Sequence, residues 1–128
     1  MTIMTPAKMA QNAYGSRAVP VRTARGTEYA AVARITQRIQ AAERRGSQGF
    51  PDLVAALNDN RRLWTILATD VADNGNALPR DLRARIFYLA EFTFQHTIKV
   101  LRGKARAAPL VEINAAVMRG LMEGNAGK

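Results

Sequence analysis

The side chains that could do acid–base or metal chemistry are few and scattered. His96 is the only histidine, the chain has no cysteine, and Asp and Glu together number 10. Catalysis needs an acid, a base, a nucleophile or a metal ion held in place by its neighbours. No carboxylate shares a polar cluster with His96, and no phosphate-binding loop, dinucleotide fingerprint or metal-spaced cluster is present. We therefore predict a protein that is not an enzyme, with no cofactor, no metal and no small-molecule substrate, in which His96 is half-buried.

Arginine and the aromatic residues suggest binding instead. The formal net charge is +9, from 19 basic and 10 acidic residues, which favours an acidic partner, a nucleic acid or an anionic surface. Arg61 and Arg62 lie close to Trp64 in the sequence, and three arginines, at positions 80, 83 and 85, precede Tyr88. Single-strand binders combine a basic surface with exposed aromatic rings, although no known RNA- or DNA-binding motif is visible. A charged face that only meets water is the simpler alternative.

The elements that would position these side chains are helices. Alanine, leucine, arginine and glutamine, which favour helix, dominate the middle of the chain, and strictly alternating β-branched runs are absent. Apolar residues recur at spacings of three and four in four segments. We predict an all-α fold, a small bundle of about four helices, at about 27–45, 51–72, 79–104 and 109–122.

The two ends of the chain are predicted to lie outside this bundle. Pro and Gly interrupt the first 26 residues, which hold basic residues and no acid. We predict a flexible basic N-terminal arm over 1–26, a single helical domain over 27–123 and a frayed tail over 124–128. No apolar run approaches the roughly 20 residues needed to span a bilayer, and the N-terminus lacks the apolar stretch of a secretory signal. We expect a cytoplasmic protein without membrane insertion; an organellar transit peptide is the alternative reading of the arm.

The second predicted helix supplies a core anchor and one polar exception. Trp64 is the only tryptophan, and a ring of its size buries roughly 150–250 Å². Asn60 falls on the same stripe, so it is either buried with hydrogen-bond partners or placed at the stripe's edge in water. The residues predicted to anchor the core are Leu63, Trp64, Leu67, Leu78, Leu82, Ile86 and Leu89.

The third predicted helix has more apolar surface than one packing face needs. Leu82, Ile86, Leu89 and Val100 fall on one line, and a second line roughly 115° round the helix holds Phe87, Ala90, Phe94, Ile98 and Leu101. A surface helix ordinarily has a single stripe. Either this helix is central and covered on two sides, or part of the second line is exposed to a partner's amphipathic helix.

Two sequence motifs resemble a known family. The run Arg62-Leu63-Trp64-Thr65-Ile66-Leu67 is followed by Asn76-Ala77-Leu78-Pro79 and Asp81-Leu82-Arg83. This combination resembles the flagellar biosynthesis regulator family FlaF of flagellated alphaproteobacteria. The resemblance covers Tyr14 to Leu121, and the arm is similar to that of the longer-armed rhodobacterial-type branch. Many members begin with a shorter segment, so residues 1–11 depart from the family pattern.

The resemblance implies a role in making flagella. The resemblance implies that the protein is needed for flagellin to be produced and exported, and that it acts after transcription, in opposition to or in partnership with a second regulator, FlbT. Flagellin ends in amphipathic helices that are unpaired before the filament forms, so the leading hypothesis is a flagellin-binding adaptor or export chaperone. The alternatives are direct binding of flagellin mRNA and action through FlbT. The residues predicted to bind the partner are Arg61, Arg62, Phe87, Tyr88, Phe94, Ile98 and Leu101.

Overall fold

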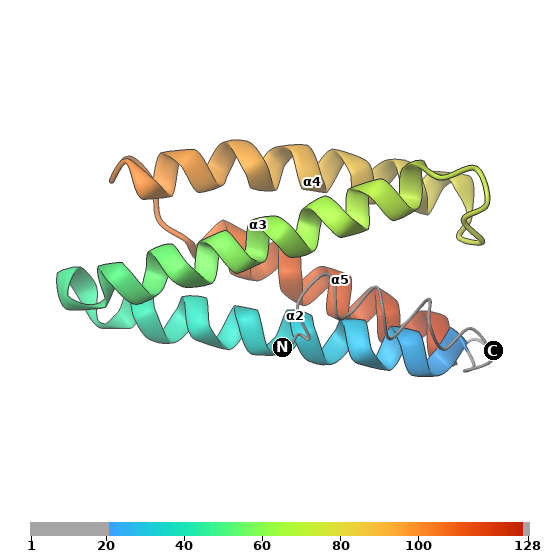
Figure 1. The fold of residues 1–128 in the computed structure, drawn as a ribbon, viewed down its shortest axis with the longest axis horizontal. Helices are drawn as coiled ribbons and strands as arrows, with labels where there is room; N and C mark the ends of the chain where they lie inside the picture. The colour runs from blue at the N-terminus through green and yellow to red at the C-terminus, as the bar shows by residue number, and fades with distance from the viewer. Residues whose placement is uncertain (1–20, 127–128) are drawn as a thin grey trace.

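The computed structural model describes residues 21–126 of the chain, with side chains described over 29–120. Over that range the chain forms four α-helices, one short 3-10 helix and no strand, which confirms the predicted all-α bundle (Figure 1). The elements are α2 (Val21–Arg44), η1 (Gly46–Gly49), α3 (Phe50–Ala72), α4 (Arg80–Leu101) and α5 (Ala108–Ala126).

Two predicted helix ends are wrong. Helix α2 begins at Val21, six residues before the predicted start, and α5 continues to Ala126, beyond the predicted end at Met122. A single glycine inside a helix costs about 1 kcal/mol, so Gly26 does not end a helix that has helix formers on both sides. Residues 21–26 of the predicted arm and 124–126 of the predicted tail are therefore helical. Residues 1–20 and 127–128 lie outside the described residues.

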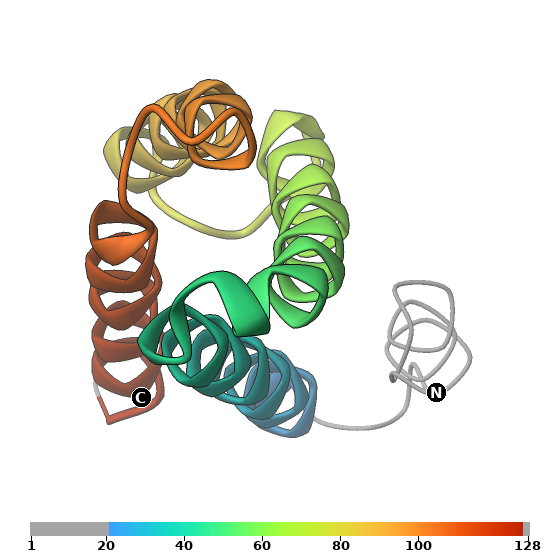
Figure 2. The same ribbon diagram turned by 90° about the vertical axis from the view of Figure 1, so that its left-hand side faces the viewer.

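The four helices stand around a ring in the order α2, α3, α4, α5 (Figure 2). Helix α3 packs against both α2 and α4, and α2 also packs against α5. The contact between α4 and α5 is much smaller than the other three. Helix α3 is therefore the best covered element, and α4 is attached chiefly through α3.

The core lies among α2, α3 and α5. Its largest fully buried side chains include Ile39, Leu57, Trp64 and Leu110, each at most 1% exposed. Asn60 is also fully buried, so the alternative that places it in water at the edge of the stripe is wrong.

A buried hydrogen-bond network joins these three helices. The Asn114 side chain on α5 donates from Nδ2 to Asn60 Oδ1 at 2.9 Å and to Thr36 Oγ1 at 3.0 Å. Its Oδ1 accepts from Trp64 Nε1 at 2.9 Å. Buried polar groups are stable only when they are paired, and one amide here satisfies groups on α2 and α3 together.

Tight connections hold the ends of the helices. Gly49 is buried between α2 and α3, where a Cβ atom would lie 2.1 Å from the Ala42 carbonyl oxygen. At the end of α4, Gly103 has φ 73°. There the Lys104 N–H donates to the Lys99 carbonyl at 2.8 Å, and the Gly103 N–H donates to the Val100 carbonyl at 3.0 Å. This is a Schellman arrangement, in which a glycine in the left-handed region closes the helix.

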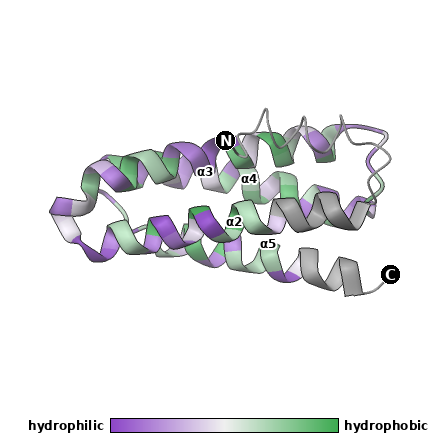
Figure 3. Cartoon of the chain, turned by 60° about the horizontal axis from the view of Figure 1, so that its bottom comes forward, coloured by the Kyte–Doolittle hydropathy of each residue, from purple (hydrophilic) through white to green (hydrophobic). Residues whose placement is uncertain are grey.

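Hydrophobic residues (green) occur along α4 as well as along α3 (Figure 3). Within the described residues, no helix is both long and apolar enough to cross a membrane.

Candidate partner-binding surface

Helix α4 packs on the bundle through a narrow seam of small side chains. Its buried residues are Ala90, Thr93, Thr97 and Val100. The Thr97 hydroxyl donates to the Thr93 carbonyl at 2.6 Å, one turn earlier, which satisfies that hydroxyl inside the seam. Because so little of α4 is buried, the alternative that makes this helix central is wrong.

Most of the large apolar side chains of α4 lie beside this seam rather than in it. Leu82, Ile86 and Leu89, which we predict as core anchors, are half-buried. Phe87 and Ile98 are 47% and 48% exposed, and Leu101 is 37% exposed. The second apolar line predicted from the sequence is therefore open to solvent over much of its length.

Phe94 connects this open line to the core. It is half-buried and packs against the core cluster. Positions 87, 94, 98 and 101 are separated by seven, four and three residues, so their side chains share one face of α4. Within this face, Phe94 packs against the core, and Phe87, Ile98 and Leu101 are exposed to solvent.

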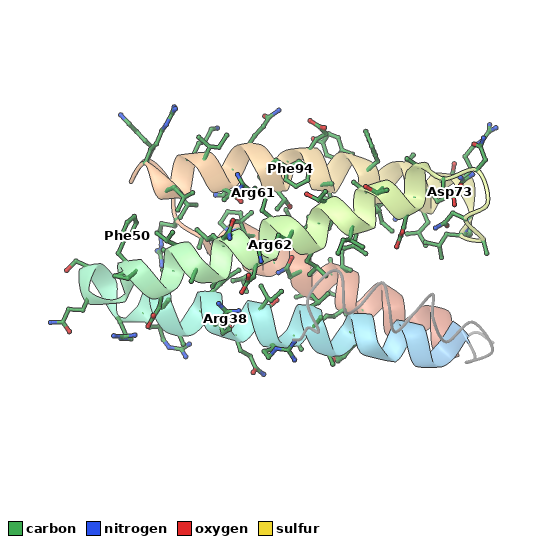
Figure 4. All side chains as sticks on the ribbon, viewed as in Figure 1. Arg38, Phe50, Arg61, Arg62, Asp73 and Phe94 are labelled. Atoms are coloured by element: carbon green, nitrogen blue, oxygen red, sulfur yellow. The ribbon has the colours of Figure 1, made fainter. Side chains whose placement is uncertain are left out.

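Helix α3 contributes two further exposed apolar side chains that sequence reasoning missed. Phe50 is 44% exposed and Val54 is 38% exposed. They lie one turn apart on α3, and Figure 4 shows Phe50 projecting from the start of α3 towards α4. By their spacing, positions 50, 54, 57 and 61 share one face of α3. The sequence does not indicate that this face lies next to α4, which follows only from the packing of the two helices. We call the set Phe50, Val54, Phe87, Phe94, Ile98 and Leu101 the apolar strip.

The two adjacent arginines of α3 have different surroundings. Figure 4 shows Arg61 on the side of α3 that faces α4 and Arg62 nearer to α2. Arg62 Nη1 lies 3.7 Å from Asp59 Oδ1, and the other carboxylate oxygen of Asp59 accepts from Arg38 Nη1 at 2.7 Å. Of this predicted pair, Arg61 therefore borders the apolar strip and Arg62 does not.

Tyr88, also predicted in the binding site, belongs to a different face of α4. It is 68% exposed and lies about 100° round the helix from Phe87. Arg85, Phe92 and Lys99 share its side of the helix by their spacing. We call Arg85, Tyr88, Phe92 and Lys99 the outer face.

His96 is half-buried at the border of this outer face. Its ring stacks on Phe92, with centroids 5.3 Å apart and planes 12° apart. Its Nε2 lies 2.8 Å from the Arg106 carbonyl oxygen, in the connection to α5. These contacts give the ring a packing role. Among residues 29–120, no group of three or more His, Asp or Glu residues could hold a metal ion.

The motif residues behind the family resemblance are mostly architectural. Leu63, Trp64 and Leu67 are buried in the core. In the connection between α3 and α4, Asn76 Nδ2 donates to the Asp70 carbonyl at 3.0 Å, and Asn76 Oδ1 accepts from the Leu78 N–H at 2.9 Å. Leu78, predicted to anchor the core, is half-buried there. These motifs set how α4 follows α3, and so they position the apolar strip.

Comparison with known proteins agrees with the sequence motifs. The family model described as flagellar protein FlaF matches residues 10–121. No curated protein and no solved structure matches the chain significantly. The matched region includes all of the described helices except the last five residues of α5. The resemblance is thereby confirmed, and the chain belongs to the FlaF family of flagellar proteins.

Proposed function

We propose that this FlaF protein binds flagellin in the cytoplasm before the filament assembles, as an adaptor or export chaperone. The observation that carries the proposal is the apolar strip, in which five large side chains are 37–48% exposed and a sixth, Phe94, is half-buried. Contiguous exposed apolar surface on a small protein is typical of a site for another protein. Membership of a flagellar family makes flagellin the leading candidate.

The shape of the strip supports a helical partner. Its α4 residues follow a helical line, and the antiparallel α3 supplies Phe50 and Val54 along one side. An amphipathic helix docks by placing residues at i, i+3, i+4 and i+7 against such a surface. Flagellin helices that are unpaired before assembly carry this kind of apolar face, and covering it would prevent premature association.

The direct test is calorimetry or size-exclusion chromatography with monomeric flagellin. The informative variant is the double change Ile98→Asp and Leu101→Asp, because both side chains are exposed and neither belongs to the core cluster. We expect it to weaken binding by about tenfold or more while leaving the circular dichroism spectrum unchanged. Phe94→Asp acts on the same surface but also disturbs the core, so its folding must be checked separately.

Phe92→Asp is the matched control for flagellin binding. Phe92 is 38% exposed, almost the same as Leu101, but it lies on the outer face. We expect flagellin affinity to stay within about twofold of the wild type, since a residue outside the strip makes no contact with the docked helix. Equal losses for Phe92→Asp and for the double variant would contradict binding through the apolar strip.

A second candidate function, direct binding of flagellin mRNA, is favoured by the outer face. Tyr88 and Phe92 are exposed aromatics, and Arg85 and Lys99 lie on the same side of α4. Aromatic stacking next to cations is how single-stranded nucleic acids are held without a sequence code. Tyr88→Ala should then reduce RNA affinity, and binding should fall steeply with added salt.

Parallel pull-downs with flagellin, flagellin mRNA and FlbT separate these routes. Flagellin captured by the wild type and lost with the Ile98→Asp, Leu101→Asp variant supports the adaptor. RNA captured at low salt and lost with Tyr88→Ala supports the mRNA regulator. If only FlbT is captured, both direct routes are wrong and the protein acts through FlbT.

A further inference from the structure

The charges around the apolar strip differ between its two halves. One half runs from Phe50 to Arg61 on α3 and from Phe94 to Arg102 on α4. The charged side chains that border this half are basic. Arg61 lies on the side of α3 that faces α4 (Figure 4), and Arg102 directly follows Leu101 at the end of α4. Both of these cations are exposed.

The nearby acids of α3 are directed elsewhere. Asp52 and Asp59 of α3 bond to Arg45 and Arg38, respectively, on the side of α3 that faces α2. Glu91 is the acid of α4 closest to the strip, and it lies in the other half, between Phe87 and Phe94. The half of the strip that ends at Leu101 therefore has an apolar centre with a basic border.

We propose that this basic-bordered half of the strip receives an acidic amphipathic helix, one whose apolar stripe is flanked by Asp or Glu. This inference rests on the proposed function and specifies which kind of segment is bound. Positions 94 to 101 span about 10 Å along the helix axis, so the docked segment covers about two turns. Opposite charges along an apolar contact favour the correct partner and orientation.

Two other occupants fit this half less well. A second copy of the chain would carry the same cations, so a symmetric contact through this half would bring Arg61 and Arg102 of both copies close together. A nucleic acid would need several exposed rings next to the cations. This half has one exposed ring, Phe50, and one half-buried ring, Phe94, while its other apolar side chains are aliphatic.

The test uses the full chain and three fluorescein-labelled helical peptides, titrated by fluorescence anisotropy. One peptide has a leucine stripe flanked by Glu, the second has the same stripe flanked by Lys, and the third has the composition of the first in scrambled order. We expect the Glu-flanked peptide to bind about tenfold tighter than either of the others. Equal binding of the Glu-flanked and scrambled peptides would show simple charge attraction and overturn the proposal.

Variants locate the contact. Arg61→Glu should weaken the Glu-flanked peptide by about two- to fivefold and strengthen the Lys-flanked one. Arg34→Glu is the control, because it changes the net charge equally at an exposed position of α2 away from the strip. If Arg61→Glu and Arg34→Glu changed the affinity for the Glu-flanked peptide equally, the proposed site would be wrong. The Ile98→Asp, Leu101→Asp double variant should lose the Glu-flanked peptide.

The same proteins distinguish this inference from the proposed function. If flagellin binds through the strip but the Glu- and Lys-flanked peptides bind equally, the function stands and the charge selectivity is overturned. If the Glu-flanked peptide binds at the strip and flagellin does not, the surface is supported and flagellin is overturned as the partner. Binding of the strip to phosphatidylglycerol vesicles, with no binding of the Glu-flanked peptide, would replace the helix with a membrane surface.

Discussion

The bundle has two regions that differ in how their helices are held. Helices α2, α3 and α5 enclose large buried side chains and share the Asn114 network. Helix α4 packs through Ala90, Thr93, Thr97 and Val100, and leaves most of its aromatic and branched side chains at the surface. A helix with apolar residues around much of its circumference therefore need not lie in the centre of a bundle. The first region therefore holds most of the buried core, and the second presents the apolar surface through which we propose that a partner binds.

The largest expected effect contrasts one aromatic from each region. Trp64→Ala should lower the free energy of unfolding by about 3–5 kcal/mol, because Trp64 is fully buried and its indole N–H is bonded. Phe94→Ala should cost only about 1–2 kcal/mol, since Phe94 is half-buried. Urea unfolding followed by circular dichroism measures both. If Phe94→Ala lowered the free energy of unfolding as much as Trp64→Ala, the two regions would not differ in their contribution to stability.

Loss of the central amide should come next. Asn114→Ala leaves Trp64 Nε1 and Asn60 Oδ1 without their partner inside the core. We expect a loss of about 2–3 kcal/mol, because unpaired buried polar groups keep their desolvation cost. The control is Asn58→Ala at an exposed position of α3, which should change stability by less than about 0.5 kcal/mol. Similar values for the two variants would show that the network contributes little.

A glycine pair tests the packing between α2 and α3. Gly49→Ala would place its methyl group against the Ala42 carbonyl oxygen, so we expect a loss of about 1–3 kcal/mol in unfolding free energy. Gly120→Ala meets nothing within 4 Å inside α5. It should stabilise the protein by about 0.5–1 kcal/mol through helix propensity. Changes of the same sign would argue against tight packing at Gly49.

The smallest effect concerns the seam under α4. The Thr93 hydroxyl is buried and has no hydrogen-bond partner among the described residues, whereas Thr97 donates to the Thr93 carbonyl. Thr93→Val should therefore raise the unfolding free energy by about 1 kcal/mol, and Thr97→Val should lower it by about 0.5 kcal/mol. Thermal unfolding of the two variants measures the difference. A loss with Thr93→Val would mean that its hydroxyl is satisfied.

Much of the fold follows from local patterns in the sequence. Stripes at spacings of three and four predict four helices, Pro51 lies in the first turn of α3, and Gly103 lies just beyond the end of α4. The predicted start at 27 and the predicted end at 122 are wrong, because the single glycines at positions 26 and 124 cost less than the neighbouring helical residues gain.

The candidate surface is only partly visible in the sequence. The second apolar line of α4 contains Phe87, Ile98 and Leu101, which are all exposed, but the contribution of Phe50 and Val54 depends on how α3 packs against α4. The pairing of Asn60 with Asn114 joins residues 54 apart in the chain, and no local pattern encodes it. The sequence also cannot show that Thr93 and Thr97 face inwards, since hydroxyl side chains ordinarily suggest a solvated face.

The connection after α4 has a consequence for binding. It is fastened at its start by the hydrogen bonds around Gly103, and at its far end the Ala107 N–H donates to Glu43 Oε2 of α2 at 2.6 Å. Leu101 and Arg102 therefore sit on backbone that is already ordered before any partner arrives. This surface then loses less conformational entropy when a complex forms, which favours affinity even for the short contact of about two turns that we propose.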